Sequence, residues 1–404
     1  MQIMFRPGFL FGGLLVVMGC VAAFAPVNFN VLSSTNIAAS GGEKTTFDIK
    51  TKLNAAALII QNKGGGHGEI GFQLAKKLST NDKIDSITIL QDDVCDMKSE
   101  PFKSYASLPD DVTVVYAKLG DKSVDAKIMQ RWLGGDDVKF QYIYDNYSKG
   151  PEGSSKSLLD CVNNWGDCKL YTYVSSAGIY QATDKTEFPM GEDTTPIKKS
   201  AGQAKMDNYV SIECNLPLVS FRPQYIYGEK SNKYDYIDWY FDRLTRNLPL
   251  PIPSPGTQTV SLTNSQDVAS LLAAPLDNEE AAVKQRFFNC GTDKLVTYDE
   301  VAFLCAEVAG IPKKEVKIVH YSGDALGKGN FPFRLTDFYV APDMAKEKLG
   351  YLGATNDLKD DLKWYYEEYN KTRREKKNID LVKDREIIIS SKIDANVYDQ
   401  YINN

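Results

Sequence analysis

The chain has 404 residues, of which 43% are hydrophobic, so it is long enough to bury a large core. Its formal net charge of −6 excludes an overall positive field that would draw it onto nucleic acid, and such contacts would need a local basic patch. The seven cysteines form no Cys-x-x-Cys pair and there are only two histidines, which disfavours a zinc site. Reduced, mostly buried thiols are expected rather than a disulfide framework.

The N-terminus has the features of a targeting sequence. An apolar run over residues 9–25 contains a small-residue pattern that fits signal-peptidase cleavage before Phe24. Residues 24–47 are rich in Ser, Thr, Asn and Ala and poor in acids, as transit peptides are. A signal peptide over 1–23 followed by such a stretch resembles the bipartite presequences of algae with secondary plastids. We therefore predict a mature protein that starts near Asp48 in the plastid stroma, off the membrane; the alternative is a plain secreted protein.

From residue 50 onward, short apolar runs alternate with longer amphipathic ones. This alternation is typical of repeated strand–helix units, so we predict an α/β fold with a Rossmann-like doubly wound parallel sheet over residues 48–250. Helices are expected over 70–79 and 123–133. The expected strands are 55–60, 86–90, 112–116, 140–144, 170–175 and 217–221.

A smaller C-terminal α/β lobe is predicted over 251–370, interleaved with the first domain. It would follow the proline-rich run 249–256, which we expect to be a stiff break. Its helices are expected over 267–276, 297–309 and 344–349. The tail, 371–404, is charged and weakly periodic, and we expect it to pack loosely.

A glycine-rich loop follows the first expected strand. Gly65, Gly68 and Gly71 have the spacing of a dinucleotide-binding fingerprint, which permits a tight turn, close approach to a pyrophosphate and close helix packing. Asp92 ends the second expected strand, where it would bind an adenosine ribose and favour NAD over its 2′-phosphorylated form. Glu69 counts against a bound cofactor, because a carboxylate beside the phosphate site would repel pyrophosphate unless it points away.

A pair of serines ending at Ser176 closes the fifth expected strand. In the extended short-chain dehydrogenases and epimerases that this arrangement resembles, a catalytic tyrosine follows about 25 residues later, with a lysine four residues after it. Those positions hold Ala201 and Lys205. Ser176 and Lys205 are therefore vestigial, and dehydrogenase or epimerase chemistry is not expected to survive. Tyr180 and Tyr209 are the nearest substitutes, although Tyr180 is expected to point into the following loop.

Two further segments extend this resemblance to about residue 350. Phe221–Gly228 resembles the Leu-Arg-Pro-x-x-x-Tyr-Gly segment of extended short-chain enzymes. Ser265–Ala269 is similar to their Val-x-Asp-Val-Ala element, which begins a helix with an aspartate near its N-terminus.

Short segments spread over both predicted lobes carry a narrower resemblance. They are Ser175–Tyr180, Phe221–Tyr225, Asp238–Arg243, Pro249–Pro253, Phe288–Cys290, Val319–Tyr321, Phe331–Arg334 and Tyr365–Tyr369. Over roughly residues 55–380 the chain resembles the chloroplast stem-loop-binding proteins, plastid RNA-binding members of the short-chain superfamily. The loop at 65–72 is closer to the member described as an endoribonuclease. The resemblance implies binding of plastid stem-loop transcripts, association with ribosomal or transcription-linked particles, and cleavage dependent on a divalent metal such as Mg²⁺.

Two basic groups are candidates for RNA contacts, and aromatic side chains near 234–241 would stack on unpaired bases. The alternatives are solvated helix faces for the basic groups and core or subunit packing for the aromatics. The first group is Lys371, Arg373, Arg374, Lys376 and Lys377. The second, beside the former active-site cleft, is Lys198, Lys199 and Lys205.

A nuclease site is harder to assign. Metal-assisted hydrolysis needs clustered carboxylates, and Asp92, Asp93 and Asp145 lie at the expected carboxyl edge of the sheet. Ribose contacts and loop capping explain them better than metal binding does, so metal ligands and catalytic residues stay unassigned. We favour plastid RNA binding in transcript or ribosomal RNA processing or stabilisation, with endoribonuclease activity, by a homo- or hetero-oligomer. The alternatives are an NAD-dependent nucleotide-sugar epimerase or dehydratase, and a non-catalytic structural partner in a plastid ribonucleoprotein.

Overall fold

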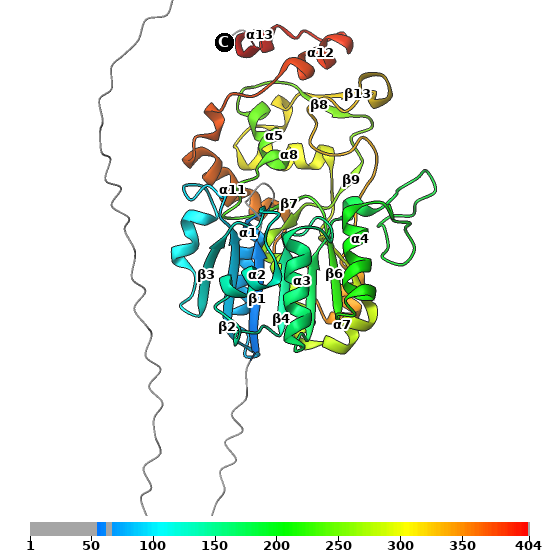
Figure 1. Cartoon of the computed structure of the whole chain (residues 1–404). Helices are drawn as coiled ribbons and strands as arrows, with labels where there is room; N and C mark the ends of the chain where they lie inside the picture. Colours follow the sequence, from blue (N-terminus) through cyan, green and yellow to red (C-terminus); the bar gives the residue numbers. More distant parts are fainter. Residues whose placement is uncertain (1–54, 62–66, 403–404) are drawn as a thin grey trace, which may run out of the picture. The chain divides into compact units, whose positions relative to one another are not determined.

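The computed structural model describes residues 55–61 and 67–402 (Figure 1). The expected signal peptide, transit segment and mature N-terminus lie outside the described residues, and so does Gly65 of the glycine loop. Among the helices of the described part, none combines the length and the apolar character needed to cross a membrane.

Seven parallel strands form the central sheet, in the order β11-β6-β5-β4-β1-β2-β3. The predicted Rossmann-like fold is confirmed, and so are its six expected strands; β11 is an edge strand that the sequence pattern did not predict. The chain order reverses between β1 and β4, and folds of this kind bind ligands at that switch point. The strands are β1 (Ala55–Gln61), β2 (Ile84–Asp92), β3 (Val112–Ala117), β4 (Tyr142–Asn146), β5 (Leu170–Val174), β6 (Leu218–Pro223) and β11 (Phe287–Cys290).

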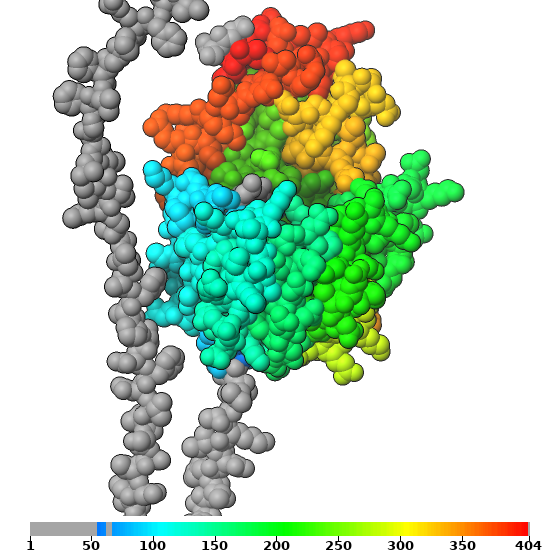
Figure 2. Space-filling view, viewed as in Figure 1, coloured from blue at the N-terminus to red at the C-terminus, as the bar shows by residue number. Residues whose placement is uncertain are grey.

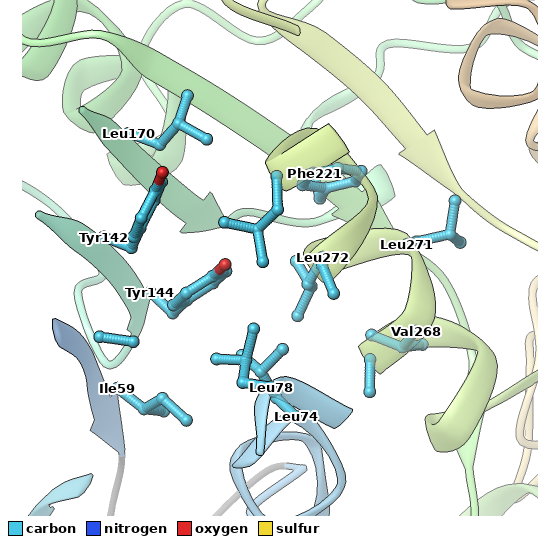
Figure 3. Packing of buried hydrophobic residues seen from close by; sticks show 14 of the residues in the cluster. Ile59, Leu74, Leu78, Tyr142, Tyr144, Leu170, Phe221, Val268, Leu271 and Leu272 are labelled. Carbon is cyan, nitrogen blue, oxygen red and sulfur yellow. The ribbon is translucent and has the colours of Figure 1, made fainter. Parts of the chain in front are cut away.

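Helices cover both faces of the sheet, because alternate residues of each buried strand point to opposite sides. Ile59 of β1 belongs to the apolar cluster with α1 and α6, whereas Leu58 belongs to the cluster with α2, α3 and α4. In Figure 3, Tyr144 of β4 points toward the side chains of the covering helices, among them Leu78 of α1 and Leu272 of α6. The helices are α1 (Glu69–Leu78), α2 (Ala126–Trp132), α3 (Ser154–Trp165), α4 (Gly202–Asn208) and α6 (Ser265–Ala273).

The smaller lobe packs around an aromatic core. Tyr240 and Phe241 of α5 and Phe333 are fully buried there, against α8 and α11. α5 precedes the predicted boundary at residue 250, so the two lobes interleave. The helices are α5 (Asp235–Leu244), α8 (Tyr298–Val308) and α11 (Leu358–Lys371). Short strand pairs join them: β7 (Ile226–Tyr227) with β10 (Thr263–Asn264), and β9 (Thr259–Val260) with β12 (Val296–Thr297).

Two predictions for the C-terminal half are wrong in detail. The proline-rich run is not a break but contains β8 (Leu250–Pro253), which pairs in parallel with β13 (Ile318–Tyr321). The backbone N–H of Leu250 donates to the carbonyl oxygen of Lys317, the residue before β13, and the prolines, which have no N–H to donate, alternate with such residues. The helices expected at 267–276 and 344–349 belong to the sheet instead: α6 and α10 (Asp343–Leu349) share its apolar cluster with α7 (Glu279–Gln285).

The tail packs more closely than the sequence predicts. Leu381, Ile388 and Tyr398 are buried together with Leu248 and Val319 of the smaller lobe. Figure 2 shows the tail, in red, seated on that lobe. Its helices are α12 (Val382–Ser390) and α13 (Asp399–Ile402), and the short α9 spans Gly323–Leu326.

Candidate functional site

Two cavities open at the carboxyl edge of the sheet, beside the switch point. The larger has a volume of about 860 Å³ and the smaller about 220 Å³. The loop after β4 stands between them, because Tyr147 and Lys149 line both. The larger cavity is also walled by Asp92 of β2, Lys118 after β3 and Lys205 of α4. Ligand sites usually measure about 300–1,000 Å³, so only the larger cavity has the size of one.

The glycine loop carries its own negative charge. Gly68 caps α1, and Glu69 is the first residue of that helix. The Glu69 side chain is fully buried, and its Oε1 lies 3.1 Å from Nδ1 of His67. His67 has a φ of 62°, in the left-handed region that non-glycine residues rarely adopt. A carboxylate in the first turn interacts with the positive end of the helix dipole, where the fingerprint would place a pyrophosphate.

Side-chain amides fill the space beneath this loop. Gln61, the last residue of β1, donates from Nε2 to the carbonyl oxygen of Gly68 at 2.7 Å. Its Oε1 accepts a hydrogen bond from Nδ2 of Asn146 at 3.0 Å. A Cβ atom at Gly71 would collide with the Gln61 amide, so the third glycine here makes room for a side chain. Sequence reasoning missed Gln61 and Asn146; a glutamine that ends an apolar strand was the available signal.

The serine pair lies at the wall of the smaller cavity, as predicted for the end of β5. Ser175 is buried, and its hydroxyl has no hydrogen-bond partner among the residues that the structure describes. The Ser176 hydroxyl accepts a hydrogen bond from the backbone N–H of Gly178 at 3.0 Å. Ser176 thus caps the short turn that follows β5.

Helix α4 retains the lysine of a short-chain site without the tyrosine. Ala201 is the N-cap of the helix, and the side chain of Lys205, one turn on, is exposed at the wall of the larger cavity. A Cβ atom at Gly202 would collide with the carbonyl oxygen of Lys149. The loop after β4 therefore packs directly on the first turn of α4.

The two tyrosines considered as substitutes do not supply the missing phenol. Tyr180 is fully buried, its hydroxyl donates to Oδ1 of Asn289 at 2.7 Å, and burial raises its pKa to about 12. Tyr209 lines a different cavity. Tyr147 lies in the site, but burial and then the neighbouring carboxylates raise its pKa. Because a general base needs a pKa near the working pH, Tyr180 and Tyr147 are poor proton acceptors.

The three candidate metal carboxylates have different roles. Asp145 caps the loop after β4: its Oδ1 accepts hydrogen bonds from the N–H groups of Tyr147 and Ser148, at 3.0 and 2.9 Å. Asp92 is buried and Asp93 exposed, both at the wall of the larger cavity. Within residues 55–61 and 67–402, no group of three or more His, Cys, Asp and Glu side chains is arranged to hold a metal ion. We therefore assign no ligand set for the expected Mg²⁺.

The C-terminal basic run divides between the surface and the interior. Arg374 is buried, with Nε 3.1 Å from the carboxylate of Asp238 and its guanidinium 4.0 Å from the ring centre of Tyr234. Nζ of Lys377 lies 2.8 Å from the same carboxylate. Arg374 is thus a structural residue rather than a surface contact, and Lys377 shares its partner. The exposed members of the run are Lys371, Arg373 and Lys376.

Two members of the second basic group, Lys199 and Lys205, line cavities at the cleft, whereas Lys198 donates to the carbonyl oxygen of Gly178. Lys198, Lys199 and Lys205 are exposed, and no carboxylate of the described chain lies within ion-pair distance of them. Lys205 lines both the larger cavity and a third one, which Lys199 also lines. The aromatics near 234–241 pack in the core instead: Trp239, Tyr240 and Phe241 are buried.

The third cavity, of about 970 Å³, has a buried acid at its wall. Asp207 of α4 faces Ser220 and Arg222 of β6, and burial raises its pKa to about 6 despite those neighbours. Arg222 is buried too and donates to the Tyr180 hydroxyl at 2.9 Å.

We expect Asp207→Asn to stabilise the protein by roughly 1–3 kcal/mol at pH 8, because it removes the cost of a buried charge. The folded-state pKa of Asp207 lies above its unfolded value, so its contribution favours folding below about pH 4 and is lost as the pH rises through 6. Urea unfolding from pH 4 to pH 8 should show the variant's advantage growing with pH. The exposed Asp193→Asn is the control, and an equal gain for both variants would contradict the assignment.

One end of the cleft fits the dinucleotide that the glycine loop predicts, and the other end does not. Asp92 lies where an adenosine ribose would bind. The buried carboxylate of Glu69 lies in the first turn of α1, the helix end that would receive the pyrophosphate. The residue at that end therefore does not fit a bound pyrophosphate, and we derive no chemical step through NAD.

Solved structures with this fold include enzymes of nucleotide sugars. The dTDP-glucose 4,6-dehydratase of Bacillus anthracis, solved with NAD, is 15% identical with a TM-score of 0.59, over 79% of this chain and 98% of that chain. The UDP-glucose 4-epimerase of Thermotoga maritima, solved with UDP-glucose, is 19% identical with a TM-score of 0.55, over 79% and 99%. At these identities the likeness shows the fold alone.

Sequence comparison adds a plastid relative and a family. The chloroplast stem-loop binding protein of 41 kDa b from Arabidopsis thaliana is 32% identical over 216 residues, which are 52% of this chain and 54% of that protein. The chain thus spans about half the length of the curated relative that it matches. The model of the NAD dependent epimerase/dehydratase family matches residues 64–291, more than half of the chain. The chain belongs to the NAD dependent epimerase/dehydratase family.

Proposed function

We propose that this protein binds structured RNA in the plastid and acts in the processing or stabilisation of transcripts or ribosomal RNA. The observation that carries the proposal is the 32% identity, over 216 residues, to a protein named for chloroplast stem-loop binding. The chloroplast location of that relative and the presequence features of residues 1–47 support a plastid location. Metal-dependent cleavage at stem-loops, association with ribosomal or transcription-linked particles, and oligomer formation belong to the same proposal.

The geometry of the cleft supports a role without hydride transfer. Ala201 stands at the position of the proton-transferring tyrosine, and the nearby Tyr180 is held in a buried hydrogen bond. Glu69 occupies the helix end at which a bound dinucleotide would place its pyrophosphate. The family scaffold is thus retained while its redox centre is not.

The direct test is crosslinking of the protein in isolated plastids followed by sequencing of the bound RNA. In vitro, the full chain should retard a stem-loop RNA in a gel and leave UDP- and dTDP-sugars unconverted in the presence of NAD⁺, as followed by chromatography. Parallel incubations with Mg²⁺ and with a chelator test the cleavage step. Conversion of a nucleotide sugar without RNA retardation would overturn the proposal in favour of the epimerase or dehydratase alternative.

Restoring the tyrosine should not restore catalysis. Ala201→Tyr places a phenol one turn from Lys205, but the buried Glu69 at the start of α1 remains in place. We expect no conversion of a UDP-sugar in the presence of NAD⁺, followed by chromatography, from a variant whose circular dichroism matches the parent. Turnover by this variant would show that the missing tyrosine is the main defect and would revive the enzyme alternative.

The cleft lysines should carry the RNA contact. Charge reversal at Lys149, Lys199 and Lys205, all exposed, should lower stem-loop affinity roughly 10- to 100-fold at low salt and reduce the salt slope by about 2. The matched control reverses Lys371, Arg373 and Lys376 and leaves the buried Arg374 intact. A larger loss of affinity from the control reversals would place the RNA-binding surface at the C-terminal basic run instead.

A further inference from the structure

The third cavity lies on the side of the sheet that α4 covers, apart from the cleft at the switch point. Its wall is formed by α4, by segment 192–199 and by residues of β6 and the edge strand β11. Among the described residues, it shares Pro151 and Lys205 with the larger cavity, and its other lining residues come from none of β1, β2, α1 or α5. Its volume of about 970 Å³ is that of a ligand site.

Two arginines at its wall have no carboxylate within ion-pair distance among the residues that the structure describes. Arg222 of β6 is 2% exposed, and its Nη1 donates to the Tyr180 hydroxyl at 2.9 Å. Its Nε is buried and has no hydrogen-bond partner in the described chain. Arg286, between α7 and β11, is half-buried and lines the same cavity. Because buried donors are normally paired, guanidinium groups in this state indicate that an acceptor from outside the chain completes the site.

The backbone of Arg286 has a conformation that suits glycine. Its φ is 69° and its ψ is −45°, outside the region that residues with a side chain readily adopt. Two hydrogen bonds hold it there: its N–H donates to the carbonyl oxygen of Ala282 at 2.8 Å, and its own carbonyl oxygen accepts from Ser220 at 2.7 Å. Strained residues of this kind cluster at functional sites. An arginine where glycine would fit better therefore indicates a role for its side chain at the cavity.

Carboxylates share the wall, but the two buried ones are easily neutralised. Burial raises the pKa of Asp207 to about 6, and it also raises the pKa of Glu192. Oε1 of Glu192 is engaged within the fold, because it accepts a hydrogen bond from the backbone N–H of Asn289 at 2.7 Å. The other acids and the lysines at the wall are exposed: Asp193, Glu213, Lys199 and Lys205. When the two buried acids are protonated, the arginines and lysines outnumber the remaining acids, so the cavity attracts an anion.

The lining residues favour an anion that carries an organic group. Guanidinium groups are planar donors that match the oxygens of a phosphate. Phe287 and Tyr209 are half-buried at the same wall, and Ile212 is 65% exposed, which gives the cavity an apolar side. Inorganic phosphate alone would leave most of this space unfilled.

We infer that the third cavity binds a phosphomonoester. Arg222 and Arg286 hold the phosphate, and Phe287 and Tyr209 contact the group that carries it. A free sugar phosphate and the phosphorylated 5′ end of an RNA offer the same chemistry. The inference goes beyond RNA binding and does not rest on it.

The test is isothermal titration of the full chain with ribose 5-phosphate, with ribose and with inorganic phosphate. We expect ribose 5-phosphate to bind about tenfold more tightly than either of the other two, because it alone engages both the arginines and the apolar side of the cavity. Equal binding of ribose and ribose 5-phosphate, or no binding of ribose 5-phosphate at millimolar concentration, would overturn the inference.

A short single-stranded RNA with a 5′-phosphate, and the same RNA with a 5′-hydroxyl, separate the two sources of the ligand. If RNA ends are the ligand, the phosphorylated RNA displaces ribose 5-phosphate and the hydroxyl RNA does not. If neither displaces it, the ligand is a small phosphate ester and the assignment of the cavity stands. Equal displacement by both RNAs would show that the site binds phosphodiesters and would contradict the inference. Retardation of stem-loop RNA without ribose 5-phosphate binding defeats this site alone, whereas the reverse result defeats the proposed function alone.

Two variants and a control test the residues. Arg286→Gly should weaken ribose 5-phosphate binding about tenfold and unfold in urea no earlier than the parent, because glycine suits a φ of 69°. Lys284→Ala removes an exposed cation of α7 that does not line the cavity, and it should bind like the parent. Asp207→Asn should tighten binding about threefold at pH 8, because it removes a negative charge from the cavity wall. If Arg286→Gly unfolds more easily and binds normally, Arg286 is a structural residue and the site is refuted.

Discussion

Replacing Asp238 by alanine should lower the free energy of unfolding by about 3–5 kcal/mol, because the change leaves buried cations without their partner. Asp238 lies in α5 with 1% of its surface exposed. Its carboxylate lies 3.1 Å from Nε of Arg374 and 2.8 Å from Nζ of Lys377, and it accepts a hydrogen bond from the Tyr365 hydroxyl at 2.9 Å. It therefore joins α5 to α11 and to the start of the tail.

Urea unfolding measures this effect, and the matched control is Asp360→Ala. Asp360 is an exposed carboxylate of α11 whose partner is Lys363, three residues on. Exposed ion pairs of this kind contribute little to the free energy of unfolding, so the Asp360→Ala variant should unfold like the parent protein. Asp238→Asn should cost less than alanine, since the amide oxygen still accepts from Tyr365. A loss for Asp238→Ala no larger than that of the control would show that Arg374 finds another partner.

This expectation bears on how an RNA surface is tested. A charge reversal that includes Arg374 would place a carboxylate against Asp238 and unfold the junction of α5 and α11. If such a variant lost RNA binding, the loss would reflect misfolding rather than the removal of an RNA contact. Only the exposed members of the run, Lys371, Arg373 and Lys376, are safe to reverse.

The central sheet was predictable because its first six strands are short apolar runs, and inner strands such as β1 are buried on both faces. Ile59 and Leu58 are adjacent and both fully buried, one on each side of the sheet, which leaves a continuous apolar signal in the sequence. β8 was missed because prolines normally argue against a strand. Those of β8 are tolerated since they alternate with residues such as Leu250, whose N–H donates to the carbonyl oxygen of Lys317 just before β13.

The tail and the site were less predictable, for different reasons. The tail is charged along its length, and its anchors Leu381, Ile388 and Tyr398 are spaced too irregularly to signal burial. At the site, the loss of the tyrosine at Ala201 was visible because it breaks a fixed spacing. The hydrogen bond between Gln61 and Asn146 could not be predicted from the sequence, since it depends on which residues of β1 and β4 become neighbours in space. Likewise, nothing local distinguishes the buried Arg374 from the exposed cations beside it.

Replacing Asp384 by alanine should destabilise the protein by a similar amount, about 3–5 kcal/mol. Asp384 of α12 accepts a hydrogen bond from Nε of Arg243 at 2.6 Å, and both side chains are at least 97% buried. The guanidinium also donates to the carbonyl oxygen of Trp239 at 2.8 Å and lies 4.0 Å from its ring centre. Without Asp384, a charge would remain buried with no compensating carboxylate, and α12 would lose its attachment to α5.

Burial raises the pKa of Asp384 even though Arg243 opposes the shift, so desolvation of the carboxylate outweighs the gain from the pair. For that reason an apolar pair should be tolerated where a single deletion is not. We expect the double variant Arg243→Met/Asp384→Leu to recover most of the stability that Asp384→Ala loses, measured by urea unfolding. If the double variant is as unstable as Asp384→Ala, the ion pair fixes the position of α12 in a way that apolar packing does not replace. If Asp384→Ala itself costs under about 1 kcal/mol, the tail is not anchored through this pair.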